Sequence, residues 1–279
     1  MTYLFVKNKS VILNNMENIK QLREMTGAGM VDCKKALDEA GGDLNQAVEI
    51  LRKKGIAKAA KRTDRETNEG IVMLSVNDTA TEGYMVEVNS ETDFVSRNEK
   101  FQDFTKQILE VIKTLKPAVL EELLAAPFSD TTLKESLETL SGVIGEKLDI
   151  KRLAIVSGES VTAYSHLGGR MGVLVAFDQK VNPEIASDVA MQVAASNPKY
   201  LVASEVPQEE MDKEKEIYRA LLLKEGKPEE MVDKIVAGKM SKYYSEVCLT
   251  EQEYIKDDKK KVKDILGGAA ITKFVRFSL

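Results

Sequence analysis

A strand-like pattern gives way to a helical one within Tyr84-Met85-Val86-Glu87-Val88-Asn89-Ser90-Glu91-Thr92-Asp93-Phe94-Val95-Ser96-Arg97-Asn98-Glu99. Its first five residues alternate as in a half-buried strand, and the helical run that follows carries Phe101, Phe104, Ile108 and Leu109. Ser96 and Glu99 have capping-box spacing, which predicts that Ser96 is the N-cap of this helix. Asp93 and Phe94 are then expected in a short turn just before the helix.

Two interpretations of Asp93 and Phe94 stay open at this point. A carboxylate beside a large ring at such a junction can be presented outward as a rigid two-residue probe. Alternatively, Phe94 folds back onto the core and Asp93 only assists the turn. The local pattern favours the second interpretation, because most aromatic residues are buried.

Composition limits the class of protein. A length of 279 residues predicts about two domains. The formal net charge of -5 argues against a general nucleic-acid binder, which would usually be basic. Two cysteines are too few for a disulfide scaffold, so a reduced, cytoplasmic compartment is expected. No run of 18 apolar residues occurs, so no membrane span is predicted.

Residues 1–15 are expected to be an extension outside the fold. Two apolar runs within them are interrupted by Lys7 and Lys9, and no small-residue cleavage site follows. A secretory signal is therefore not predicted, and Met16 is the expected start of the folded part.

Residues 16–57 predict a module of three short helices. Gly41-Gly42 is expected to end the second helix. Asp43 with Gln46 is expected to cap the third, and Gly55 to close it. Residues 58–69 are charged, almost free of large apolar groups, and are interpreted as a solvated linker.

The loop Thr26-Gly27-Ala28-Gly29-Met30 raises the alternative of a nucleotide-dependent enzyme. It begins like a dinucleotide-binding fingerprint, but Asp32 stands where the third glycine belongs and the preceding residues predict a helix rather than a strand. No Walker motif occurs either, so no cofactor or nucleotide site is predicted. Met30 at the tip is core or contact, with core as the default.

Residues 70–157 predict the first half of an α+β core. Strands are expected at 71–76, 84–88 and 151–156, and further helices at 117–125 and 131–147.

Residues 158–279 predict the second half. Gly168-Gly169 predicts a β-hairpin between strands at 161–167 and 170–177. A helix at 185–195 and a closing strand at 271–279 are expected. Within this half, residues 205–247 predict an inserted antiparallel helical hairpin that turns at Gly226-Lys227-Pro228.

His166 is the only histidine and lies beside the predicted β-hairpin turn. One histidine without a nearby cysteine or second histidine makes no convincing metal site. It is either an ordinary hydrogen-bonded histidine at a strand end or a residue that faces a partner.

Four motifs together resemble the elongation factor Ts family. They are Leu22-Arg-Glu-Met-Thr-Gly-Ala-Gly-Met-Val-Asp-Cys-Lys-Lys-Ala-Leu37, Thr92-Asp-Phe-Val95, His166-Leu-Gly-Gly-Arg-Met-Gly-Val-Leu174 and Leu222-Leu-Lys-Glu-Gly-Lys-Pro228. They occur in the family's order from about residue 16 to the end, and such a set is far more specific than any one motif.

The resemblance implies an α+β fold: an N-terminal module similar to ubiquitin-associated (UBA) domains, then two related sheet-and-helix halves with the helical hairpin in the second. It implies a guanine nucleotide exchange factor for elongation factor Tu, a GTPase, and no enzyme, cofactor or metal of its own. Thr92, Asp93, Phe94 and Val95 would insert into the partner and disturb its magnesium and phosphate contacts. Arg23 and Met30 would touch the partner's GTP-binding domain, and His166 another of its domains.

The chain departs from the family pattern in two places. Many relatives continue into a C-terminal helical module, whereas this sequence stops at Leu279, and residues 1–15 have no counterpart. The helical hairpin could support a homodimer. No direct nucleic-acid or membrane partner is expected. A third alternative, a scaffold acting through residues 17–55 alone, leaves the motif at Thr92–Val95 unexplained.

Overall fold

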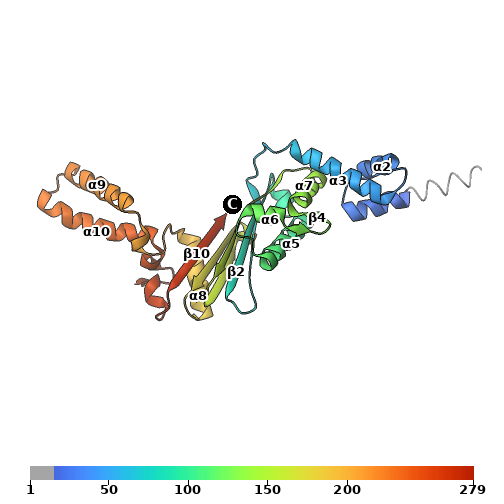
Figure 1. Cartoon of the computed structure of the whole chain (residues 1–279). Coiled ribbons are helices and arrows are strands. Elements are labelled where there is room, and N and C mark those ends of the chain that lie inside the picture. The colour runs from blue at the N-terminus through green and yellow to red at the C-terminus, as the bar shows by residue number, and fades with distance from the viewer. Residues whose placement is uncertain (1–15) are drawn as a thin grey trace, which may run out of the picture. The chain divides into compact units, whose positions relative to one another are not determined.

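The computed structural model describes residues 16–279, and the extension predicted at residues 1–15 lies outside them (Figure 1). The chain divides into two compact units. One consists of the residues up to Gly70 together with Val88–Lys151, and the other of Ile71–Glu87 together with Arg152–Leu279.

The first unit begins with the predicted module of three helices, at residues 16–26, α2 (Met30–Glu39) and α3 (Leu44–Ala60). Its small core contains Leu22, Ala28, Cys33, Ala36, Leu37, Ala40 and Ala47. Gly41 and Gly42 both have positive φ directly after α2, as the prediction of a helix end requires. The Asp43 side chain accepts a hydrogen bond of 3.0 Å from the backbone N–H of Gln46, which confirms the predicted cap.

The predicted end of the third helix at Gly55 is wrong, because α3 continues to Ala60. Gly55 instead faces Gly142 of α7 (Leu133–Ile144). A Cβ added to Gly142 would lie 2.4 Å from the Cα of Gly55, far inside van der Waals contact. The glycines allow two helix backbones to cross closely, and neither one ends its helix.

The charged residues 58–69 are mostly exposed, as a solvated linker would be, but several of them also bind residues distant in the sequence. They begin as the last turn of α3, and Arg62 then donates a hydrogen bond of 3.2 Å to the carbonyl of Ser141 in α7. The ammonium of Lys147 donates to the carbonyls of Thr63 at 2.7 Å and Arg65 at 2.9 Å. The segment therefore keeps exposed side chains, while Arg62 and two of its carbonyl groups bind residues distant in the sequence. The domain limits drawn from the sequence stay predictions.

The rest of the first unit is mostly helical. Its elements are α4 (Asp93–Ser96), α5 (Glu99–Leu115), α6 (Leu120–Ala125), β3 (Pro127–Phe128), β4 (Thr131–Thr132) and α7. The apolar face of α5 buries Phe101, Phe104, Ile108, Leu109 and Ile112. Phe104 meets Phe128 edge-on, with ring centroids 5.2 Å apart.

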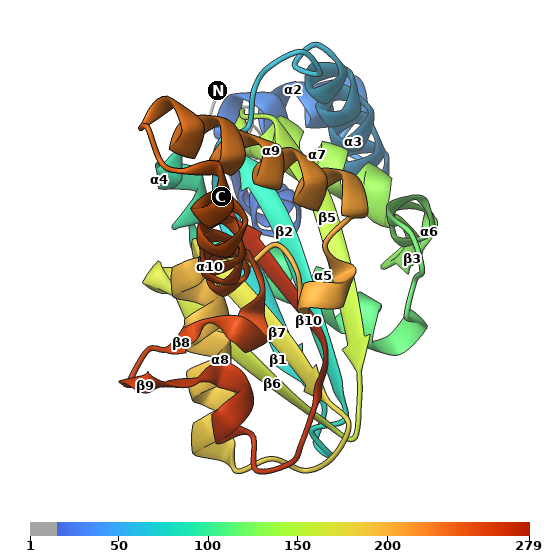
Figure 2. The same cartoon turned by 90° about the vertical axis from the view of Figure 1, so that its left-hand side faces the viewer.

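Both predicted sheets form. The first has β1 (Glu69–Val76), β2 (Glu82–Ser90) and β5 (Leu148–Ser157) in the order β1-β2-β5. The second is antiparallel and has β6 (Ser160–His166), β7 (Met171–Phe177) and β10 (Ile271–Ser278) in the order β10-β7-β6 (Figure 2). The short 3-10 turn η1 (Leu167–Gly169) joins β6 to β7, as the Gly168-Gly169 pair predicted.

Strand β7 is buried on both faces, so it forms the centre of the second unit. On one face Leu174 and Ala176 pack with Val72, Met85, Val156, Val161 and Phe277. On the other face Val173, Val175 and Phe177 pack with α8 (Pro183–Ser196) and with Leu249, Val262 and Ile271. This burial explains its near-continuous apolar sequence.

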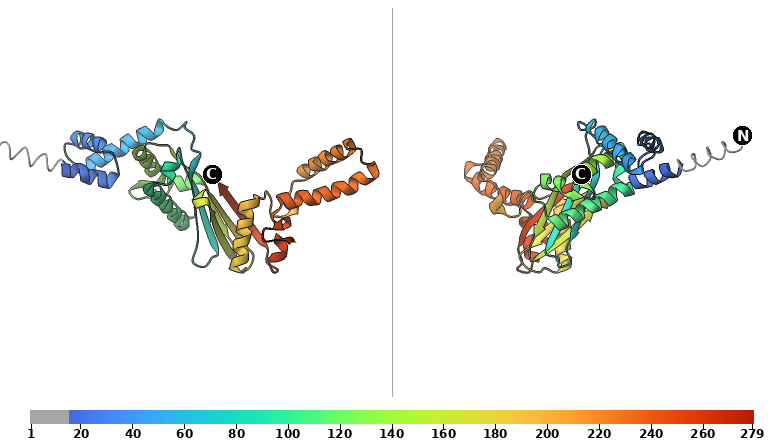
Figure 3. Two further views of the ribbon diagram at one scale, coloured as in Figure 1. Left: turned by 180° about the vertical axis from the view of Figure 1, so that it is seen from behind. Right: turned by 45° about the vertical axis from the view of Figure 1, so that its right-hand side comes forward.

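The predicted helical hairpin consists of α9 (Gln208–Lys224) and α10 (Glu229–Val247), which pack side by side (Figure 3). Gly226 has φ of 75° at the turn, and the backbone N–H of Lys227 donates to the carbonyl of Leu222. Pro228 is the N-cap of α10 rather than its first helical residue. At the base, Tyr200 and Tyr243 both donate hydrogen bonds to Glu210.

Small elements complete the second unit. They are η2 (Ala203–Glu205), η3 (Leu249–Glu251), β8 (Glu253–Tyr254), β9 (Asp257–Lys261) and η4 (Val262–Ile265). The sequence did not predict the β8–β9 pair, because its charged residues have no apolar alternation. Among residues 16–279, no helix has the length and apolar character needed to cross a membrane.

We expect Gly142→Ala to destabilise the first unit by about 1–3 kcal/mol, the usual range for overpacking. The added methyl would meet backbone atoms of Gly55, which cannot rotate away as a side chain can. Chemical denaturation followed by circular dichroism measures the change.

Gly238→Ala in α10 is the matched control, because a Cβ there has no atom within 4 Å. Alanine's higher helix propensity should stabilise that helix by up to about 1 kcal/mol. Gly142→Ala that stabilised the protein as much as the control would contradict a close helix crossing.

Candidate functional site

Phe94 lies on the short helix α4 with 84% of its surface exposed. The next two residues, Val95 and Ser96, are buried. Asp93 and Phe94 therefore form the first turn of a four-residue helix, and the expectation of a simple turn before the helix is wrong. The interpretation that Phe94 folds back onto the core is also wrong. The short helix faces inward at its end and presents an aromatic ring outward at its start.

Ser96 does not cap α5 as the capping-box spacing predicted. It is the last residue of α4, and its hydroxyl donates 3.0 Å to the carbonyl of Asp93. Asn98 is the N-cap of α5, and its side chain accepts from the N–H of Lys100. The extra turn formed by α4 therefore displaces the start of the long helix.

Every polar group of Thr92 has a partner. Its backbone N–H donates 3.0 Å to Oε2 of Glu146, and its hydroxyl donates 2.7 Å to Oε1 of the same carboxylate. Its carbonyl accepts from the Ser90 hydroxyl at 2.9 Å. The residue directly before Asp93 and Phe94 is thus held from several directions.

Asp93 pairs with Arg97 one helical turn later, at 2.9 Å. The two side chains are 40% and 79% exposed. An exposed pair of this kind contributes only about 0–1 kcal/mol. The Asp93 carboxylate can therefore exchange this partner for another at little cost.

Glu91 forms a second carboxylate contact beside Thr92. Its Oε1 accepts 2.6 Å from the backbone N–H of Lys147, and both oxygens lie 3.1 Å from Nη1 of Arg65. The amide hydrogen bond from Lys147, then the bond from Arg65, lower the pKa of Glu91, although its partial burial opposes this.

Arg23 and Met30 lie on either side of the glycine loop in the three-helix module, and both are exposed. Met30 is 57% exposed, so its default assignment to the core is wrong. The residues before the loop are helical, as expected, which leaves no strand for a nucleotide-binding fingerprint. A Cβ added to Gly27 would lie 2.6 Å from Nζ of Lys100, so the loop lies against the start of α5.

His166, at the end of β6, belongs to the second unit. It is exposed, its Nδ1 lies 2.8 Å from the Tyr164 hydroxyl, and the two rings stack with centroids 5.7 Å apart. The neighbouring Leu167 is 67% exposed. The histidine is hydrogen-bonded as an ordinary strand-end residue would be, and it also remains accessible to a partner.

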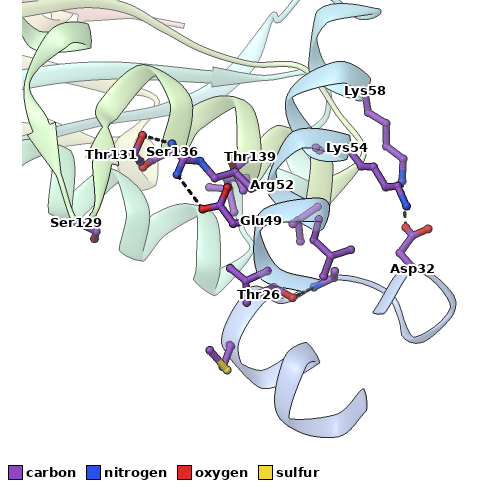
Figure 4. A pocket seen from close by; sticks show the side chains of 18 of the residues that line it. Thr26, Asp32, Glu49, Arg52, Lys54, Lys58, Ser129, Thr131, Ser136 and Thr139 are labelled. Carbon is purple, nitrogen blue, oxygen red and sulfur yellow. Dashed lines mark hydrogen bonds and ion pairs between the residues drawn. The ribbon is translucent and has the colours of Figure 1, made fainter. Parts of the chain in front are cut away.

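A pocket of about 420 Å³ lies in the first unit between the module, α3 and α7 (Figure 4). Most of its charged side chains are paired: Arg52 binds Thr131 and Glu135, and Lys58 pairs with Asp32 at 3.0 Å. Most of the charge in the pocket is therefore neutralised, and the Asp130 carboxylate is the exception among the described residues that line it.

The described part of the chain contains no group of three or more His, Cys, Asp or Glu side chains that could hold a metal ion. Cys33 and Cys248 are buried, and burial raises the pKa of both thiols, to about 11 for Cys248. A thiol with a raised pKa is a poor nucleophile at neutral pH. The exposed groups described above are suited to contact rather than to bond making.

The profile of the family described as Elongation factor TS matches residues 91–279, which include Thr92–Val95 and His166. The chain is 46% identical to elongation factor Ts of Clostridium perfringens (strain SM101 / Type A), over 93% of this chain and 90% of that protein. It is 43% identical to elongation factor Ts of Prosthecochloris aestuarii, over 94% of this chain and 97% of that protein. The chain belongs to the elongation factor Ts family.

Membership in the elongation factor Ts family makes the chain a translation elongation factor of the nucleotide-exchange class. The α+β architecture described above agrees with this assignment. Two contacts were not foreseen from the sequence, those of Glu91 and Glu146. Their local sequence gives no signal, because each binds a backbone amide contributed by a distant part of the chain.

The lowered pKa of Glu91 predicts an acid-sensitive junction. A carboxylate whose pKa is lower in the folded than in the unfolded state stabilises the fold above its ordinary value of 4.5. That contribution is lost as the pH falls through the folded-state pKa. We therefore expect Glu91→Gln to lower the free energy of unfolding by about 1 kcal/mol or more at neutral pH.

The difference between Glu91→Gln and the unaltered chain should shrink steadily below about pH 4.5. Urea denaturation at a series of pH values measures it. Glu138→Gln on α7 is the control, because the structure gives its side chain no hydrogen bond or ion pair. A Glu91 difference that grew on acidification would contradict the assignment.

Proposed function

We propose that this chain binds elongation factor Tu in its GDP-bound form and promotes GDP release, so that GTP can rebind. In this proposal Thr92–Val95 insert into the partner and disturb its magnesium and phosphate contacts. The observation that carries the proposal is the exposed ring of Phe94, presented by a helix whose other end is buried.

The side chains of α4 suit a segment that inserts between packed elements of the partner, and Asp93 and Phe94 are called the wedge below. Large aromatic side chains are usually buried, and those left exposed often anchor an interface. Phe94 offers the apolar surface, while Asp93 offers a carboxylate held only by an exposed ion pair. Phe94 would separate packed elements of the partner, and Asp93 would hold or redirect its backbone.

Other contacts would orient the partner on this chain. Arg23 and Met30 are exposed beside the glycine loop, and we propose that they touch the GTP-binding domain. His166 with the exposed Leu167 would contact another domain. Orientation of this kind raises affinity without disturbing the nucleotide, so it complements the wedge.

Exchange needs no bond making by this chain. A factor that binds the nucleotide-free partner better than the GDP-bound partner must weaken GDP binding by the same factor, because the coupling is reciprocal. Incoming GTP then displaces the factor by the same reciprocity. The absence of an enzymatic role is part of the proposal. A homodimer through α9 and α10 remains a prediction from the sequence.

We expect Phe94→Ala to reduce the catalysed rate of GDP release by roughly thirtyfold or more, because losing a central aromatic anchor costs about 2 kcal/mol or more. The fold should be unchanged, since the ring is 84% exposed. The measurement is release of a fluorescent GDP analogue from elongation factor Tu, followed by stopped flow over a range of factor concentrations.

Leu115→Ala is the control, an exposed apolar residue at the end of α5 that is 53% exposed. This variant should promote GDP release from elongation factor Tu at the same rate as the unaltered chain. Equal rates for Phe94→Ala and the control would refute the wedge, and no acceleration by the unaltered chain would refute the function.

A further inference from the structure

The short helix α4 cannot hold its own position. Four residues make only one helical turn, and starting a helix costs more than one turn returns. Its N-cap, Thr92, makes no side-chain hydrogen bond to the helix. The orientation of Asp93 and Phe94 must therefore be imposed by contacts from outside α4.

Glu146 supplies this contact at the start of the helix. It lies in the loop between α7 and β5, and its two carboxylate oxygens accept the backbone N–H and the hydroxyl of Thr92. A carboxylate that accepts two donors from one residue restrains both the position and the rotation of that residue. Its negative charge also stands at the helix N-terminus, where it is favourable.

The contact is reciprocal. Glu146 binds the amide of the residue after Glu91, and Glu91 binds the amide of the residue after Glu146, Lys147. Arg65 pairs with Glu91, which supplies positive charge beside the two carboxylates. These two reciprocal hydrogen bonds fix the register between the end of β2 and the start of β5. Helix α4 starts directly after this fixed point.

We propose that Glu146 is a positioning residue for exchange: it holds Thr92 so that Asp93 and Phe94 meet the partner in one fixed orientation. The inference rests on the proposed function of Phe94 and extends it to a residue assigned no role by the motifs. Glu146 acts through Thr92. Its loss should therefore lower the rate of GDP release from the bound partner more than it lowers the affinity between the two proteins.

The experiment compares Glu146→Ala and Glu146→Gln in the full chain. We expect Glu146→Ala to lower the maximal rate of GDP release at saturating factor by about tenfold or more, since a small displacement of a positioned group can cost up to a hundredfold. The factor concentration giving half of that maximal rate should change by less than about twofold, as expected when only the later step is affected.

Glu146→Gln should restore most of the maximal rate. The amide oxygen can accept the Thr92 N–H while the amide nitrogen donates to the Thr92 hydroxyl oxygen, so both contacts survive. Thr92→Ser, which keeps the hydroxyl, should likewise exceed Thr92→Val. Combining Thr92→Val with Glu146→Ala should cost less than the two separate losses together, because they share one interaction.

Hydrogen exchange of the peptide covering residues 90–97 tests positioning without the partner. Glu146→Ala should accelerate exchange there and leave peptides of β7 and α8 unchanged, and Glu138→Ala should alter neither. Unchanged exchange at residues 90–97, general loss of protection, or failure of Glu146→Gln to restore the rate would overturn the inference. The unaltered chain could fail to accelerate GDP release while Glu146→Ala still speeds hydrogen exchange at residues 90–97. That result would refute only the proposed function.

Discussion

Two glutamate carboxylates, each hydrogen-bonded to a backbone amide, join the end of β2 to the loop before β5. Such charge-assisted bonds are stronger than neutral ones, and the partly buried site screens them less than open water would. Arg65 offsets the charge of Glu91, which reduces the repulsion between the two carboxylates. The exposed ring of Phe94 depends on this junction, because the helix that carries it has too few residues to stand alone.

The first unit is built around close contacts that oppose movement of this junction. Gly55 and Gly142 bring α3 and α7 together, and Arg62 and Lys147 bind carbonyl groups across the same region. The module that carries Arg23 and Met30 is thereby packed onto the helices that follow α4. A flexible tether would have left these exposed groups free to adopt many relative positions, at an entropic cost on binding.

Local patterns predicted much of this architecture. The turns at Gly41-Gly42 and Gly168-Gly169 and the alternation in β2 depend on neighbouring residues, so the sequence alone reveals them. Gly55 and Glu146 were misread or missed because their roles depend on partners distant in sequence. Ser96 was misread because the extra turn of α4 moves the start of α5 to Asn98. A glycine at a helix crossing and one at a helix end look alike in a sequence. The exposure of Phe94 opposed its local pattern, and only the resemblance of the whole chain anticipated it.

The exposed ring has a cost in the free protein. Burying a phenylalanine side chain stabilises a fold by about 1.5–3 kcal/mol, and Phe94 forgoes most of that. This free energy of burial is gained instead when a partner covers the ring. A ligand shifts a partner between two states only by the difference in its affinity for them. A rigidly held ring discriminates between the two states better than a mobile one, which could adapt to both. Under the proposed function, the fixed register between β2 and β5 therefore contributes to nucleotide exchange as much as the ring itself does.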